Sequence, residues 1–193
     1  MRNLRSPLLA VILLFAVLLL VAAPLLIRRS ILPQPVADDN RLVEYNNPTL
    51  GFKLQRPEPW TVVEDHPQLI AQGQDMLHGV AFVPNTDEQK ALVMVYVQTL
   101  TDTQTLQDYA AKQRADLEAN AQVTSSALKP LTINGQAALE TGAITSVSGE
   151  PLQYRLIMLI NGQRAYALLY TGPNGGTSSE RFQSMLDSFE FVR

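Results

Sequence analysis

The chain contains no cysteine and only two histidines in 193 residues. It therefore has no disulfide framework, no thiol nucleophile and no cysteine-ligated metal or iron–sulfur site. A Ser–His–Asp triad has few candidates, and no Gly-x-Ser-x-Gly sequence occurs. The glycine-rich stretch 172–176 contains Pro173 and lacks the lysine of a phosphate-binding loop. These absences disfavour a hydrolase or a nucleotide-dependent enzyme, and we expect no cofactor.

Basic residues are scarce beyond the N-terminus. Four of the 15 Lys and Arg and two of the 18 Asp and Glu precede residue 40, which leaves 11 against 16 and a net charge of −5. Nucleic-acid-binding domains concentrate positive charge to neutralise phosphates. The sequence therefore argues against a nucleic acid as the partner.

The N-terminal part holds one long apolar run. Residues 7–27 contain no charged residue and are mostly Leu, Val, Ala and Ile. At about 1.5 Å per residue, such a helix spans a hydrocarbon core of about 30 Å. A cleaved signal peptide would have a shorter apolar core, and Pro24 directly follows the small residues that could serve as its cleavage site. A lipoprotein signal needs a cysteine. We therefore expect residues 1–29 to form an uncleaved transmembrane anchor.

The segment after the anchor, residues 30–40, contains Pro33 and Pro35 and predicts a stiff tether to a domain at 41–193. Arginine pairs flank both ends of the anchor, so the positive-inside bias nearly cancels. The free N-terminal amine favours the N-terminus inside. We expect a single-pass protein of the cell membrane with its domain on the extracytoplasmic side.

Two apolar runs joined by Asn161-Gly162 predict the central hairpin, over residues 152–171. Both turn residues tolerate the positive φ of a type I′ turn, which would place Ile160 opposite Gln163. Both faces are apolar, so we expect the hairpin in the middle of a sheet covered on both sides. Ala165 and Ala167 on one face indicate that a helix packs closely there.

The remaining pattern predicts an α+β fold with an antiparallel sheet and helices packed on it. Asn134-Gly135 marks a second hairpin, and Thr105 with Asp108 resembles the capping box of a helix. The expected strands are 42–45, 50–55, 61–64, 80–83, 91–99, 123–133, 136–145 and an edge strand at 190–192; the expected helices are 105–120 and one starting at Thr177, and 66–79 is expected to be a loop or short helix.

One group of side chains has metal-binding character. Asp65, His66, Asp75 and His78 lie close together in sequence, and imidazole with carboxylate could bind zinc or manganese. Their spacing matches no standard zinc motif. Solvated polar residues, with Asp65-His66-Pro67 as a turn, are the simpler interpretation.

Arg155 and Arg164 fall on an otherwise apolar face of the central hairpin. They could pair with acidic neighbours such as Glu140, or line a groove for an anionic group. Buried charges are costly unless they are paired, which favours a structural ion pair with the charged groups toward water.

Several motifs resemble the PsbP/Mog1-like domains. Leu50-Gly51-Phe52-Lys53-Leu54 followed by Pro57 and Trp60 is similar to that family's Gly-Phe strand, Pro and Trp, and Phe182, Leu186 and Ser188-Phe189 resemble its closing segment. The resemblance covers residues 43–192. Pro59 stands where a Gly commonly precedes the Trp, and the lipid-attachment Cys of many bacterial relatives is missing. The resemblance implies an α/β/α sandwich with a central antiparallel sheet flanked by helices, mostly in non-enzymatic accessory proteins that are exported or lumenal.

Two functional hypotheses follow from the sequence. The first is a membrane-anchored extracytoplasmic accessory protein, not an enzyme, that engages a protein partner in assembly or stabilisation of a membrane complex. The alternative is a small-molecule or metal-ion binding domain with its site near His66 and His78.

Overall fold

The computed structural model describes residues 41–64, 77–85, 91–100, 102–121, 123–147, 150–175 and 177–192. The predicted anchor at 1–29 and tether at 30–40 lie outside these ranges. No helix within the described ranges is long and apolar enough to cross a bilayer.

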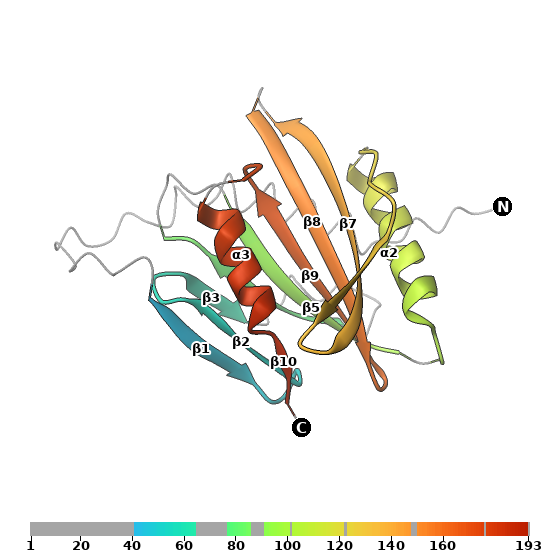
Figure 1. The fold of residues 1–193 in the computed structure, drawn as a ribbon, viewed down its shortest axis with the longest axis horizontal. Helices are drawn as coiled ribbons and strands as arrows, with labels where there is room; N and C mark the ends of the chain where they lie inside the picture. The colour runs from blue at the N-terminus through green and yellow to red at the C-terminus, as the bar shows by residue number, and fades with distance from the viewer. Residues whose placement is uncertain are drawn as a thin grey trace.

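A seven-stranded antiparallel sheet forms the middle of the domain (Figure 1). A separate three-stranded sheet packs beside α3 on one face of the large sheet. The sequence predicted its strands but not that they form a second sheet. The large sheet has the order β3 (Thr61–Glu64), β4 (Leu77–Val83), β5 (Leu92–Thr99), β9 (Arg164–Gly172), β8 (Glu150–Asn161), β7 (Gln136–Val147) and β6 (Lys129–Ile133); the small sheet has the order β1 (Leu42–Asn47), β2 (Phe52–Pro57) and β10 (Glu190–Phe191).

The central hairpin is confirmed, but its predicted turn was wrong. Asn161 pairs with Arg164, so Gly162-Gln163 form the turn and Ile160 faces Ala165. Gly162 has a φ of 59°, and Asn134 is the only described non-glycine residue with positive φ. This pattern fits a type II′ turn, which has Gly at its first central position. The register shift is two residues, so every side chain keeps its predicted face.

The two helices lie on opposite faces of the large sheet. α2 (Leu106–Ala121) packs through Tyr109 and Ala110 on the face that carries Met158, Ala165 and Ala167. This confirms the predicted helix over the small alanines. The backbone N–H of Asp108 donates to Thr105 Oγ1 at 3.1 Å, which confirms the predicted cap.

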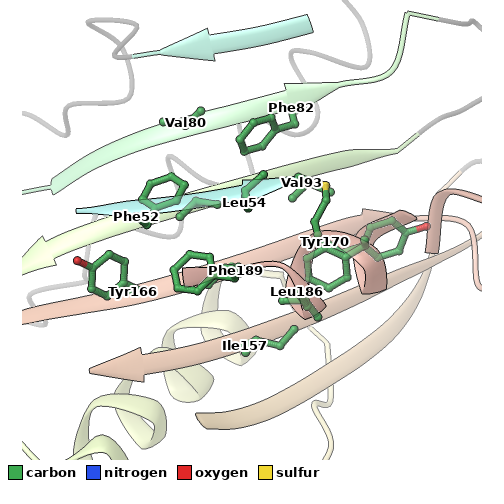
Figure 2. Packing of buried hydrophobic residues seen from close by; sticks show 14 of the residues in the cluster. Phe52, Leu54, Val80, Phe82, Val93, Ile157, Tyr166, Tyr170, Leu186 and Phe189 are labelled. Carbon is green, nitrogen blue, oxygen red and sulfur yellow. The ribbon is translucent and has the colours of Figure 1, made fainter. Parts of the chain in front are cut away.

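α3 (Thr177–Asp187) and the small sheet cover the other face. The buried face of α3 packs among aromatic rings together with Phe189, which follows the helix, as Figure 2 shows for Leu186 and Phe189. The ring of Phe189 stacks on Phe52 of β2, with centroids 5.5 Å apart. The single tryptophan, Trp60, is buried in the same core. The α+β sandwich with helices on both faces of an antiparallel sheet is therefore confirmed.

Two strand boundaries differ from the prediction by three residues or more. β4 begins at Leu77, so the last three residues of the predicted loop, 77–79, are strand. β6 covers only Lys129–Ile133, and residues 123–128 form no strand. Ser125 and Ser126 explain the second difference, because serine hydroxyls compete for backbone hydrogen bonds and favour irregular structure.

Candidate functional site

The predicted metal site falls mostly outside the described residues. Asp65, His66 and Asp75 lie there, whereas His78 is exposed near the start of β4, opposite Val97. Among the residues that the structure describes, no three His, Asp or Glu side chains gather closely enough to hold a metal ion. The four-residue site therefore stays a prediction.

Arg155 forms the predicted structural ion pair. Its Nε donates to Glu140 Oε1 at 2.8 Å, and the two side chains are 19% and 26% exposed. A second guanidinium nitrogen donates to Gln183 of α3 at 3.3 Å, and the guanidinium lies 5.3 Å from the ring centre of Phe182. Arg155 thus links β8 to both β7 and α3.

Tyr170, on the same face, is influenced by this pair. Its hydroxyl donates to the carbonyl of Pro173 at 3.0 Å, which fixes the loop before α3. Burial raises the pKa of Tyr170 to about 12, while the positive charge of Arg155 acts in the opposite direction. At neutral pH the phenol is therefore a neutral donor.

Arg164 belongs to a different contact, at the junction of the two sheets. The hydroxyl of Tyr166 donates to the backbone carbonyl of Leu50 at 3.1 Å. Burial raises the pKa of Tyr166, and the adjacent guanidinium of Arg164 opposes that shift. The Val192 N–H donates to the Gly51 carbonyl at 3.0 Å and draws the C-terminal strand to the same place.

The glycine of the Gly-Phe motif is required by this junction. Gly51 has a φ of 78°, and a Cβ there would lie 2.6 Å from a terminal nitrogen of Arg164. A side chain at this position would meet an unfavourable backbone conformation, and the guanidinium of Arg164 would have to shift to admit it. The motif is thus structural, and Arg164 packs against the backbone of the small sheet instead of pairing with Glu140.

One exposed apolar residue stands out on β7. Ile144 is 61% exposed and Leu42 is 42% exposed, and these are the exposed large hydrophobic residues of the described chain. Ile144 lies opposite Gln153 of β8, which pairs in turn with Gly172, the last residue of β9. The exposure of Ile144 was not predicted, because a strand over 123–133 would have covered this edge. The serines at 125 and 126 were the available signal.

Comparisons with known proteins support the same fold. A family whose members are described as PsbP-like proteins matches residues 10–191. The solution structure of cyanobacterial PsbP (CyanoP) from Synechocystis has a TM-score of 0.58 at 13% identity, over 86% of this chain and 99% of that chain. A variant of Mog1 has a TM-score of 0.50 at 11% identity, over 79% of this chain and 96% of that one. A protein from Bacteroides thetaiotaomicron has a TM-score of 0.50 at 16% identity, over 78% of this chain and 48% of that one. No curated protein matches the sequence.

Proposed function

This chain belongs to the PsbP-like protein family, and on that premise we propose that it is a membrane-anchored extracytoplasmic accessory protein. It binds a protein partner in a membrane complex and catalyses no reaction.

The observation that carries the proposal is the continuity between the apolar run and the folded domain. The family match begins at residue 10, inside the uncharged run 7–27, and extends to residue 191. A run of this length is sufficient to span a bilayer. The first described residue of the domain, Arg41, follows after a short proline-containing segment. Such an arrangement holds a domain close to a membrane surface.

The polar chemistry of the domain supports binding over catalysis. Arg155 donates to both Glu140 and Gln183, and the hydroxyls of Tyr166 and Tyr170 donate to backbone carbonyls. These groups hold strands and helices together. The exposed Ile144, by contrast, belongs to neither hydrophobic cluster of the described domain, and its side chain is accessible to another protein.

The absence of cysteine makes the topology directly testable. Thr132 is exposed on β6, so Thr132→Cys adds one labelling site without disturbing the core. We would express this variant at full length, treat spheroplasts with a membrane-impermeant maleimide and determine the intact mass of the product. The proposal predicts labelling without permeabilisation and a mass that retains residues 1–29.

A matched control carries Leu18→Arg and Leu19→Arg in the middle of the run. Each central arginine opposes insertion by about 2.5–3.5 kcal/mol. The control should therefore retain the domain in the cytoplasm, where the maleimide cannot reach it. If the Thr132→Cys variant with the original apolar run is labelled only after permeabilisation, the outward orientation is contradicted. A mass that lacks the N-terminal residues would contradict the anchor.

The alternative, a metal-ion or small-molecule binding domain, is supported by the exposed position of His78 next to the segment that carries the other three predicted ligands. Its test is zinc and manganese titration of the full chain, with His78→Ala as the control. Stoichiometric binding that the substitution abolishes would favour this function.

A further inference from the structure

The outer edge of β7 changes character along its length. β6 pairs with β7 from Gln136 to Glu140 and then ends. Beyond β6, Ser126 occupies the backbone groups of Gly142. Its N–H donates to the Gly142 carbonyl at 2.7 Å, and its hydroxyl accepts from the Gly142 N–H at 3.0 Å. Beyond this point, β7 pairs with β8 through Val147, but no described strand lies on its other side.

The position of Ser126 is fixed by α2. Glu118 accepts a hydrogen bond from the Ser125 hydroxyl at 2.6 Å, and Arg114 donates to the same hydroxyl at 2.8 Å. The hydrogen bond from the Ser125 hydroxyl is also the main cause that lowers the pKa of Glu118. The segment that covers Gly142 is therefore held in place, and the uncovered edge begins at residue 143.

The alternation of backbone groups determines what this edge offers. Both the N–H and the carbonyl of Gly142 point outward, as their bonds to Ser126 show. The β7–β8 register is unbroken from Ala138 to Val147, so by the two-residue period of a strand Ile144 and Ser146 also direct both groups outward. No hydrogen bond from another described residue reaches these outward groups. They form two successive donor–acceptor pairs for an added strand.

The other described edges carry features that oppose strand addition. β6 has Lys129 and Pro130, and β3 ends at Glu64. β1, the outer strand of the small sheet, carries the exposed Glu44. β10 is two residues long, and its Glu190 pairs with Lys53 at 2.9 Å. Charge, proline and short length are the usual protections of sheet edges. Residues 143–146, Ala-Ile-Thr-Ser, carry neither a charge nor a proline.

We propose that residues 143–146 of β7, hereafter the free edge, bind an extended and uncharged segment of the partner protein by strand addition. This inference rests on the proposed function and specifies the chemistry of its partner. The segment donates to and accepts from the backbone of Ile144 and Ser146. Its residue opposite Ile144 is apolar, because directly paired side chains share one face of a sheet.

Charge and size select this occupant. Residues 141–147 contain no charged side chain, and the neighbouring Glu140 and Arg155 neutralise each other at 2.8 Å. A charged segment would lose hydration here without a partner for its charge. The free edge is about 14 Å long at 3.4 Å per residue. Two rigid copies of this domain joined along it would bury less than the roughly 1,000 Å² of a stable interface, whereas an extended segment needs only the edge.

The test is hydrogen–deuterium exchange of the full chain in nanodiscs, with an uncharged probe peptide in excess. The probe has seven alternating threonine and valine residues with blocked ends. Its control is the same peptide with alternate backbone nitrogens methylated, which cannot form the ladder. We expect the probe to slow exchange of the free edge by about tenfold and the methylated peptide to leave it unchanged.

Two variants complete the experiment. Ser146→Pro removes one outward N–H, and Ile144→Lys adds a charge at an exposed position. Neither touches the pairing with β8, and both should abolish the effect of the probe. Unchanged exchange in the original chain, or equal slowing in Ser146→Pro, would overturn the proposal. Slowing that depends on protein concentration without the probe would assign the edge to a second copy and overturn the proposed occupant. None of these outcomes bears on the anchor, which the cysteine labelling tests separately.

Discussion

Tyr166 and Leu50 lie 116 positions apart in the chain, yet the hydroxyl of Tyr166 donates to the carbonyl of Leu50 at 3.1 Å. This bond joins β9, at the middle of the large sheet, to the turn before β2 of the small sheet. Gly51 lies directly beside it, under Arg164. The Gly-Phe motif is therefore where the two sheets meet, and its replacement should loosen their contact.

Gly51→Ala is predicted to destabilise the domain by about 1–3 kcal/mol, because it adds strain at positive φ and a contact of 2.6 Å with Arg164. Urea unfolding followed by fluorescence of Trp60, the single buried tryptophan, measures the loss. Gly135→Ala is the matched control. Its φ is 80°, but nothing lies within 4 Å of the added carbon. Equal losses for the two variants would show that the close contact at Gly51 costs nothing.

The Arg155–Glu140 pair is predicted to couple the β7–β8 hairpin. In a double-mutant cycle with Arg155→Met and Glu140→Gln, we expect a coupling of about 0.5–1 kcal/mol, reduced by the partial exposure of both side chains. The more exposed pair Lys53–Glu190, at 2.9 Å, should show a smaller coupling that salt weakens further. A coupling of zero for Arg155–Glu140 would contradict the structural role of this pair.

Stability is predicted to fall at alkaline pH. Burial raises the pKa of Tyr170 in the folded domain to about 12 from its ordinary 10.0. Between these values the unfolded chain has released a proton that the folded domain retains, so the free energy of unfolding decreases as pH rises. It should be constant below about pH 9 with respect to this group. Tyr170→Phe should reduce the slope of the free energy of unfolding against pH, between pH 10 and 12, by the equivalent of up to one released proton. An unchanged slope would contradict the assignment.

The alternation along the free edge predicts opposite effects of proline at adjacent positions. Ser146→Pro should leave the free energy of unfolding nearly unchanged, because the lost N–H points away from β8. Thr145→Pro should cost more than about 1 kcal/mol, because its N–H points toward β8 and pairs within the sheet. Urea unfolding compares the two. The reverse order would place Ile144 and Ser146 inward and remove the basis of the strand-addition site.

Local patterns predicted most of the fold because they were supported by tertiary packing. Both faces of the central hairpin are apolar, and the structure buries it between α2 and α3. The predicted turn of the central hairpin was wrong because Gly162 can be the second residue of a type I′ turn or the first residue of a type II′ turn. Only the contacts with β5 and β7 select between the two registers. The shift preserved the faces, so the predicted core survived the error.

The candidate site was harder to predict. The Arg155–Glu140 pair could be expected, because an isolated arginine on an apolar strand needs a partner. The free edge could not, since it results from β6 stopping early and from Glu118 and Arg114 holding Ser125. The two hydrogen bonds to Ser125 span only 7 and 11 positions, but they depend on how the chain turns after α2, and no sequence motif marks them.

Photo-crosslinking at the sheet edges of the full-length protein in its native membrane is the most direct test of whether the free edge binds a partner. A photoreactive residue at Ser146 is compared with one at Thr132 on β6 and one at Thr61 on β3, all exposed positions. We predict one discrete adduct with another protein from Ser146 alone, and its loss when Ile144→Lys is added. Adducts of equal yield from all three positions, or none from Ser146, would contradict the binding role of this edge.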